Sequence, residues 1–152
     1  MNSARVEARE PRSDAEWTAY YALRWRILRA PWQQQGPERD ESDATSTHRL
    51  VCDRQGRVLA VGRLHRVDGT TGQIRFMAVD TGQQRKGYGS LLLNALEQAA
   101  GELGLHRIIL QARENAVPFY RHHGYHTVEK SFLLFDEIQH YLMSKQLDDG
   151  LS

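Results

Sequence analysis

Polar and apolar residues alternate over several short segments of the chain, as they do in β-strands that bury one side. Residues 73–79 (Gln-Ile-Arg-Phe-Met-Ala-Val) start with this alternation and end in an apolar run, which is typical of a largely buried strand. Further short strand-like segments, several of them bounded by turn residues, predict strands over residues 5–10, 48–53, 58–67, 106–110, 125–130 and 139–146.

Apolar residues recur at helical spacing in two longer segments. The first follows a capping-box pattern at Ser13 and Glu16 and is expected to end before Pro31. The second carries its apolar positions at Leu92, Leu96, Ala99 and Leu103. A short third helix, capped by Asn115, is expected to stop at Gly124. This order of elements predicts an α/β fold with a mixed sheet of six or seven strands and helices on both faces.

Composition narrows the class of protein. The 152 residues suit one domain, and 40% hydrophobic with 26% charged residues is a globular balance. A net charge of +1 argues against binding to nucleic acid, and neither a membrane span nor a signal peptide is apparent, so we expect a cytoplasmic protein. Cys52 stands alone, which excludes an internal disulfide, and we expect it in a buried strand. Arg24, Arg26 and Arg29 are expected on a solvated helix face.

The segment Gln84-Arg85-Lys86-Gly87-Tyr88-Gly89 lies between the strand at 73–79 and the second helix. Two glycines at a helix start expose backbone N–H groups, which together with the helix dipole favour an anion such as a pyrophosphate. Leu92 stands where the Rossmann fingerprint needs a third glycine, and the Lys-Ser/Thr of a Walker loop does not follow. The alternative is that these glycines only make a tight helix entry.

Three segments in order resemble the GNAT N-acetyltransferase family. Residues 84–89 are similar to its acyl-CoA loop, and residues 119–125 (Phe-Tyr-Arg-His-His-Gly-Tyr) are similar to the segment that closes its cofactor site. Residues 136–143 resemble the final hairpin of the ElaA-like subgroup. The resemblance implies that residues 1–152 form one GNAT domain that uses acetyl-CoA. It also implies transfer of the acetyl group to a primary amine by direct attack.

The resemblance also assigns roles to residues. The strand end would offer backbone groups to the pantetheine arm, and the loop and helix start would hold the pyrophosphate. Tyr120 would protonate the departing thiolate, unless it is only a core aromatic. Asn115 would hydrogen-bond the cofactor arm, although its spacing from Tyr120 fits a helix cap equally well. The cofactor-binding set implied in this way is Met77, Ala78, Val79, Gln84, Arg85, Lys86, Gly87, Tyr88, Gly89, Ser90, Asn115 and Tyr120.

The base that takes the amine proton is not fixed by the sequence. Histone-type relatives use a glutamate where Gln73 stands, and an amide cannot serve as a base near pH 7. His65 is one candidate, because a hairpin through Gly69 would place it on the same sheet face as Gln73. His140 is the second, and for both a purely structural role is the alternative. His122 and His123 are expected on a helix surface, and the spacing of the histidines indicates no metal site.

The acceptor is weakly constrained. Glu41 and Asp43 would attract a cationic amine, whereas Arg24 or Arg75 would hold a carboxylate. A small-molecule or peptide amine is the expected partner, and a homodimer is compatible with the resemblance. Because Gln73 replaces the family's glutamate, a non-catalytic domain that binds acyl-CoA is the main alternative to an enzyme. An enzyme that uses a longer acyl-CoA is a second alternative.

Overall fold

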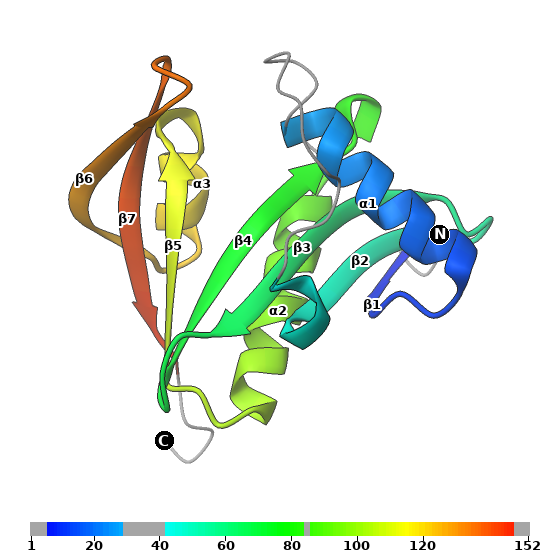
Figure 1. Cartoon of the computed structure of the whole chain (residues 1–152), viewed down its shortest axis with the longest axis horizontal. Coiled ribbons are helices and arrows are strands. Elements are labelled where there is room, and N and C mark those ends of the chain that lie inside the picture. Colours follow the sequence, from blue (N-terminus) through cyan, green and yellow to red (C-terminus); the bar gives the residue numbers. More distant parts are fainter. Residues whose placement is uncertain (1–5, 29–41, 84–85, 148–152) are drawn as a thin grey trace.

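The computed structural model describes residues 6–28, 42–83 and 86–147. Within these residues seven strands form one sheet in the order β1-β2-β3-β4-β5-β7-β6 (Figure 1). Only β4 and β5 pair in parallel, so the predicted mixed sheet is confirmed. The strands are β1 (Val6–Arg9), β2 (Thr47–Asp53), β3 (Val58–Arg66), β4 (Thr71–Val79), β5 (Arg107–Arg113), β6 (His126–Leu134) and β7 (Ile138–Gln146).

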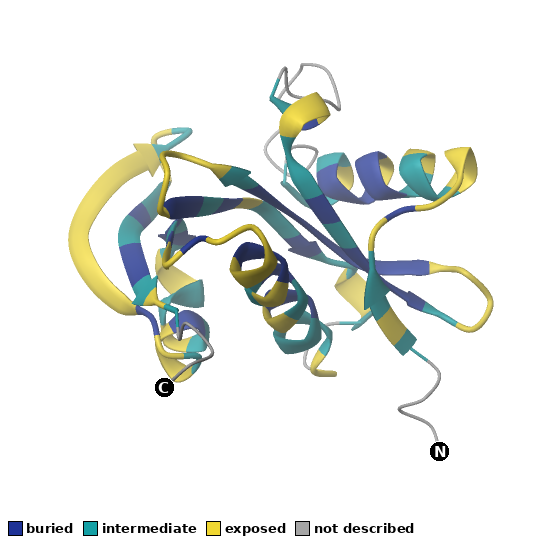
Figure 2. Ribbon diagram, turned by 90° about the horizontal axis from the view of Figure 1, so that it is seen from below, coloured by how far each residue is buried: buried dark blue, intermediate teal, exposed yellow. Residues whose placement is uncertain are grey.

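Helices cover both faces of the sheet, as predicted. One face carries α1 (Asp14–Leu28), and the other carries α2 (Tyr88–Glu102) and α3 (Val117–His122) (Figure 2). The described residues also form the 3-10 turns η3 (Asp43–Thr45), η4 (Thr81–Gln83) and η5 (Glu114–Ala116). None of the helices in the described part of the chain has the length and apolar composition that a membrane crossing requires.

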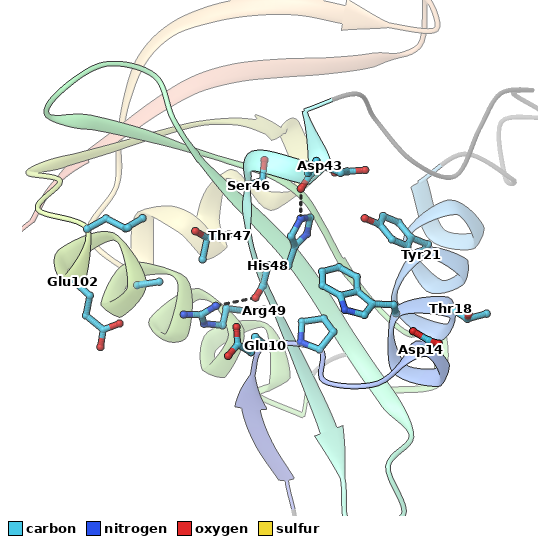
Figure 3. Close-up of a pocket in the computed structure, with 15 residues that line it drawn as sticks. Glu10, Asp14, Thr18, Tyr21, Asp43, Ser46, Thr47, His48, Arg49 and Glu102 are labelled. Atoms are coloured by element: carbon cyan, nitrogen blue, oxygen red, sulfur yellow. Dashed lines mark hydrogen bonds between the residues drawn. The ribbon is translucent and has the colours of Figure 1, made fainter.

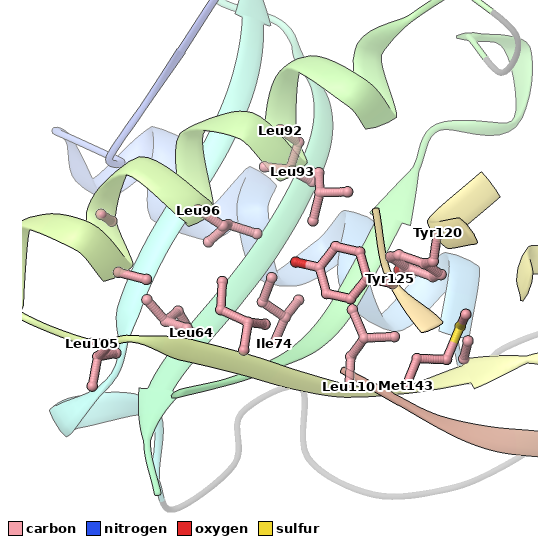
Figure 4. Close-up of a cluster of buried hydrophobic side chains, with 14 of the residues drawn as sticks. Leu64, Ile74, Leu92, Leu93, Leu96, Leu105, Leu110, Tyr120, Tyr125 and Met143 are labelled. Atoms are coloured by element: carbon pink, nitrogen blue, oxygen red, sulfur yellow. The ribbon is translucent and has the colours of Figure 1, made fainter. Parts of the chain in front are cut away.

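The larger core lies between the sheet and α2 (Figure 4). Leu92, Leu96 and Ala99 are buried because their spacing keeps them on one side of the helix. Tyr120 of α3 joins the same cluster, so α2 and α3 share one hydrophobic layer. A smaller core packs α1 against the opposite face and includes the predicted buried Cys52. The large core therefore fixes α3 relative to the start of α2.

The helix caps predicted from the sequence match the structure only in part. The Ser13 hydroxyl accepts a hydrogen bond from the Glu16 amide at 3.1 Å, as the capping box predicts. The Glu16 carboxylate, however, accepts from the Arg12 amide (2.8 Å) rather than from Ser13. The helix cap predicted at Asn115 is wrong, because β5 runs on to Arg113 and Asn115 lies exposed within η5.

A bulge in β4 separates this strand from β5. Arg75 pairs with Arg63 and Ala78 with Val61, so β4 carries one residue more than β3 between these pairs. Phe76 lies in this interval with φ +58°, a backbone conformation that is rare for a bulky side chain. β4 pairs with β5 only over Thr71–Ile74, just before the bulge. Beyond that point the two strands diverge and open a V in the sheet (Figure 1).

Candidate active site

The V between β4 and β5 contains a cavity of about 550 Å³. Its walls come from both diverging strands, from α3 and from the β6–β7 hairpin. Among the residues singled out from the sequence, Gln73, Arg75, Met77, Tyr120 and His140 line this cavity, whereas His65 and Asn115 do not. The remaining lining residues are Leu28, Ile74, Phe76, Leu110, Gln111, Ala112, Arg113, Ala116, Phe132, Leu134 and Phe135.

The Tyr120 side chain enters the cavity from the α2–α3 side of the sheet. Its hydroxyl donates a hydrogen bond to the Met77 sulfur at 3.4 Å, and the residue is only 8% exposed. Burial raises the pKa of this phenol to about 12, and the positive charge of Arg113 opposes part of the shift. Tyr120 therefore keeps its proton throughout the neutral range and is able to donate it.

His140 reaches the cavity from β7 and is buried. Its Nδ1 lies 3.0 Å from the Ile138 carbonyl oxygen, which assigns the ring proton to Nδ1 and leaves a lone pair on Nε2. The ring stacks on Phe132 with 4.4 Å between centroids. Burial lowers the pKa of His140 below 6.5, the Ile138 hydrogen bond opposes this shift, and nearby Arg113 adds to it. A neutral imidazole at pH 7 can accept a proton.

His65 pairs directly with Gln73 in the β3–β4 ladder, as the hairpin argument predicted. The two therefore share a sheet face. The Arg63 guanidinium lies 3.4 Å from His65 Nδ1. His65 is nevertheless absent from the cavity wall, whereas His140 forms part of it.

An ionic cluster supports the bulge from the α1 side. Arg24 donates to both Asp43 carboxylate oxygens (3.1 and 2.7 Å), and Arg63 donates to Oδ1 (3.0 Å). The guanidinium carbons of Arg24, Arg63 and Arg75 lie 4.5, 4.9 and 4.6 Å from the centre of the Phe76 ring. These contacts hold Phe76 in its unfavourable backbone conformation.

Two predictions about these charges are corrected here. Arg24 does not lie on a solvated face: it is 4% exposed and bound to Asp43. Arg24 and Asp43, which were expected to favour opposite kinds of acceptor, instead bind each other in a buried ion pair. Arg29 and Glu41 lie outside the described residues.

The turn at Gly87 and Gly89, called the glycine turn below, meets residues 119–125 at the start of α2. Gly87 has φ +84°, which glycine adopts freely, and its carbonyl accepts the first helical hydrogen bond from Leu91 (3.1 Å). A Cβ atom placed on Gly89 would lie 3.4 Å from Cζ of Phe119 and 3.8 Å from Cγ2 of Val79. Three segments far apart in sequence therefore converge at one point.

The neighbouring residues complete this end of the site. Tyr88, Gly89 and Ser90 are the first helical positions, whose N–H groups have no carbonyl partner within the helix. Lys86 is exposed and donates to Gln83 at 3.2 Å, while Gln84 and Arg85 lie outside the described residues. His123 does not simply decorate a surface: its Nε2 lies 2.9 Å from the Ser90 hydroxyl, and it packs on Phe119 with 4.8 Å between ring centroids. His122 is exposed, as expected.

Sequence reasoning missed Arg113 and Phe132. The strand predicted at 106–110 ended too early, so the alternation that places Gln111 and Arg113 on one face was not followed. Phe132 falls beyond the strand predicted at 125–130, which in the structure runs to Leu134. Extending both strands by their period-two pattern would have brought both residues forward as candidates.

A second cavity of about 810 Å³ lies away from the V (Figure 3). It is bounded by the first half of α1, the start of β2 and the end of α2, with Trp17, His48 and Arg49 in its wall. His48 Nδ1 lies 2.7 Å from the Tyr20 hydroxyl, and Nε2 lies 2.8 Å from the Asp43 carbonyl oxygen. Asp43 thus links this cavity to the ionic cluster behind Phe76. Among the described residues no group of three or more His, Cys, Asp or Glu side chains is arranged to hold a metal ion.

The split sheet, the glycine turn and the buried tyrosine define the class of a GNAT-type N-acetyltransferase. The model of the acetyltransferase (GNAT) family matches residues 17–125. The uncharacterized N-acetyltransferase YjcF of Bacillus subtilis (strain 168) is 34% identical over 108 residues, which cover 71% of this chain and 76% of that protein. The chain belongs to the acetyltransferase (GNAT) family and is an acyltransferase.

Solved structures share the fold. Escherichia coli ElaA superposes with a TM-score of 0.81 at 17% identity, covering 92% of this chain and 99% of that one. An aminoglycoside 6'-N-acetyltransferase complexed with coenzyme A gives a TM-score of 0.77 at 14% identity, with 93% and 96% coverage. At these identities the likeness concerns the fold alone.

Proposed function

We propose that the protein transfers an acetyl group from acetyl-CoA to a primary amine by direct attack of that amine. Two observations carry the proposal: Val79, Gly89 and Phe119 converge at the start of α2, and the cavity between β4 and β5 holds a buried tyrosine. Bound acetyl-CoA would supply an activated acetyl group, whose C–S bond breaks as the amine nitrogen forms the new C–N bond.

The start of α2 fits the phosphates of such a donor. The backbone N–H groups of Tyr88, Gly89 and Ser90 and the positive end of a 15-residue helix favour an anion. Gly89 has no side chain to cover the backbone at this point, and a Cβ there would lie in van der Waals contact with Phe119. Met77, Ala78 and Val79, which follow the bulge, would receive the pantetheine arm. We assign Gln84, Arg85, Lys86 and Asn115 to the same binding surface by resemblance.

The chain supplies an acid and a base on opposite sides of the cavity. Tyr120 holds a proton close to the Met77 sulfur and would give it to the thiolate. His140 lines the cavity with a lowered pKa and would take the amine proton at Nε2. We assign the base to His140 rather than His65, because His65 lies outside the cavity wall. Gln73, which lines the cavity, is left to position the acceptor.

The proposal extends to the setting of the enzyme. We place it in the ElaA-like subgroup because of the tail segment 136–143. We also propose that residues 1–152 form one acetyltransferase domain and that the protein works in the cytoplasm. A homodimer is supported by β6, which ends the sheet and is exposed from His126 to Leu133. Light scattering of the purified protein measures the mass; a monomer at assay concentration would contradict the dimer.

The first experiment is calorimetric titration with acetyl-CoA, with CoA and ATP as comparison ligands. We expect micromolar binding of acetyl-CoA and CoA and none of ATP. Gly87→Val should abolish this binding. Gly56→Val is the matched control, because Gly56 has φ +83° with no atom near its Cβ position, as Gly87 has, but lies in the β2–β3 turn.

The outcomes separate the two readings of the glycine turn. Both variants force a β-branched residue into the left-handed region and should lose similar stability, about 1–3 kcal/mol. Loss of acetyl-CoA binding in Gly87→Val alone supports the phosphate site. Equal binding by the two variants, or no binding by folded wild-type protein, would show that the turn is only a helix entry.

A further inference from the structure

Arg113 is a cation in the cavity that sequence reasoning did not anticipate. It ends β5 and pairs directly with His140 of β7. Directly opposed residues in an antiparallel ladder share a face of the sheet. The alternate residues of β5, Ile108, Leu110 and Ala112, belong to the core beneath α2, so Arg113 starts from the opposite, α1-side face.

No described residue supplies an anion that balances the Arg113 guanidinium. Its side chain is half-buried, and no described residue forms an ion pair or hydrogen bond with it. Burial lowers the pKa of Arg113, and the only electrostatic interaction that opposes the shift comes from Tyr120. A partly desolvated charge without a counter-ion is unfavourable, and a bound anion would remove that cost.

The charges in the cavity wall have one sign. They belong to Arg75 and Arg113, and none of the described lining residues is acidic. The phosphates of the donor do not account for this charge, because the start of α2 lies on the other face of the sheet. The cationic wall therefore faces the side from which an acceptor would enter.

We propose that the acceptor is an amine that also carries a carboxylate, and that Arg113 binds this carboxylate while His140 faces the amine. The inference rests on the proposed function. Cβ atoms of directly opposed residues lie about 4.5–5.5 Å apart, so an acceptor that reaches both side chains has its amine and carboxylate only a few bonds apart. Compact α- or β-amino acids meet this description, whereas polyamines and aminoglycosides place further positive charge against Arg75 and Arg113.

The experiment compares acceptors that differ only in the carboxylate. Glycine, alanine and β-alanine are each assayed against their amides, with spermidine as a polycationic acceptor, by release of free CoA. The amides have the less basic amines, so a preference for the carboxylates cannot come from amine protonation. Wild-type enzyme should prefer the carboxylates. In Arg113→Gln, kcat/KM should fall about 10- to 100-fold further for the carboxylates than for the amides, and the additional fall should appear in KM.

Controls separate this inference from the proposed function. Arg113→Lys should recover part of the loss, and Arg57→Gln, in the exposed β2–β3 turn, should lose nothing. Turnover of the amides or spermidine at least as fast as the carboxylates overturns the inference. An equal fall in kcat for both acceptor kinds in Arg113→Gln also overturns it, since Arg113 would then act through Tyr120. In either case intact acetyl-CoA binding by calorimetry leaves the proposed function standing, whereas its loss in folded wild-type protein would refute that function.

Discussion

Replacement of Tyr120 by phenylalanine separates a catalytic phenol from a core aromatic. The variant keeps the ring and removes only a hydroxyl whose hydrogen bond goes to the Met77 sulfur at 3.4 Å. A single weak bond of this kind contributes about 1 kcal/mol or less, so the melting temperature should change by no more than about 2–4 °C. Acetyl-CoA affinity should also stay the same.

The expected loss of turnover follows from the acidity of the phenol. With a pKa of about 12, Tyr120 is a weaker acid than a thiol of ordinary pKa near 8.5. Complete proton transfer to the thiolate would thus be uphill by about 5 kcal/mol, and help arises only as charge develops on sulfur. We expect an effect at the low end for general acid catalysis, about 100-fold in kcat, or about 2.7 kcal/mol.

Tyr125→Phe is the matched control. Tyr125 lies in the same core, 5.8 Å from the Tyr120 ring, and donates to Glu97 at 2.8 Å. Removal of the Tyr125 hydroxyl should lower the free energy of unfolding by about 1–3 kcal/mol and leave kcat within about twofold of wild type. CoA release, calorimetry and thermal melting give the three readouts. Unchanged kcat in a folded Tyr120→Phe enzyme, or an equal drop in both variants, would refute the role of general acid.

Three further predictions concern stability. Asp43→Asn removes the carboxylate shared by buried Arg24 and Arg63 and should lower the free energy of unfolding in urea by about 3–5 kcal/mol; Glu7→Gln, at an exposed ion pair, should cost less than about 1 kcal/mol. Burial raises the pKa of three tyrosines, so the folded state holds protons that the unfolded chain releases, and stability should fall as pH rises above about 10; a flat urea midpoint between pH 9.5 and 11 would contradict this. Burial lowers the pKa of His140, so its contribution to the free energy of unfolding is present above about pH 6.5 and is lost as pH falls through the folded-state pKa. The difference in this free energy between wild type and His140→Gln should therefore shrink from pH 7.5 to pH 5.

The strands and helices could be predicted because their signals are local. Apolar runs in 48–53 and 58–67, bounded by turn residues, and helical spacing around Leu96 fix each element without knowledge of the rest of the chain. The glycine turn was equally readable, since Gly87 adopts the left-handed conformation that its residue type suggests.

What could not be predicted depends on contacts between distant residues. Phe76 carries no sign of a positive φ, and it is held there by arginines from α1 and β3. Arg24 looks like a surface residue in sequence, because its partner Asp43 lies 19 residues further along the chain. The opening of the sheet, which leaves His140 but not His65 in the cavity wall, depends on such long-range contacts.

The bulge at Phe76 has a consequence for how the enzyme can diverge. A sheet normally separates the two sides of a domain, but the gap beside β4 opens a cavity whose wall includes Tyr120 of α3 and Arg113 of β5. In the function proposed above, the start of α2 and Phe119 would hold the donor, whereas Arg113 and Phe132 would face the acceptor. Because these two sets share no residue, substitutions at Arg113 and Phe132 would change the acceptor without altering the residues that bind the donor.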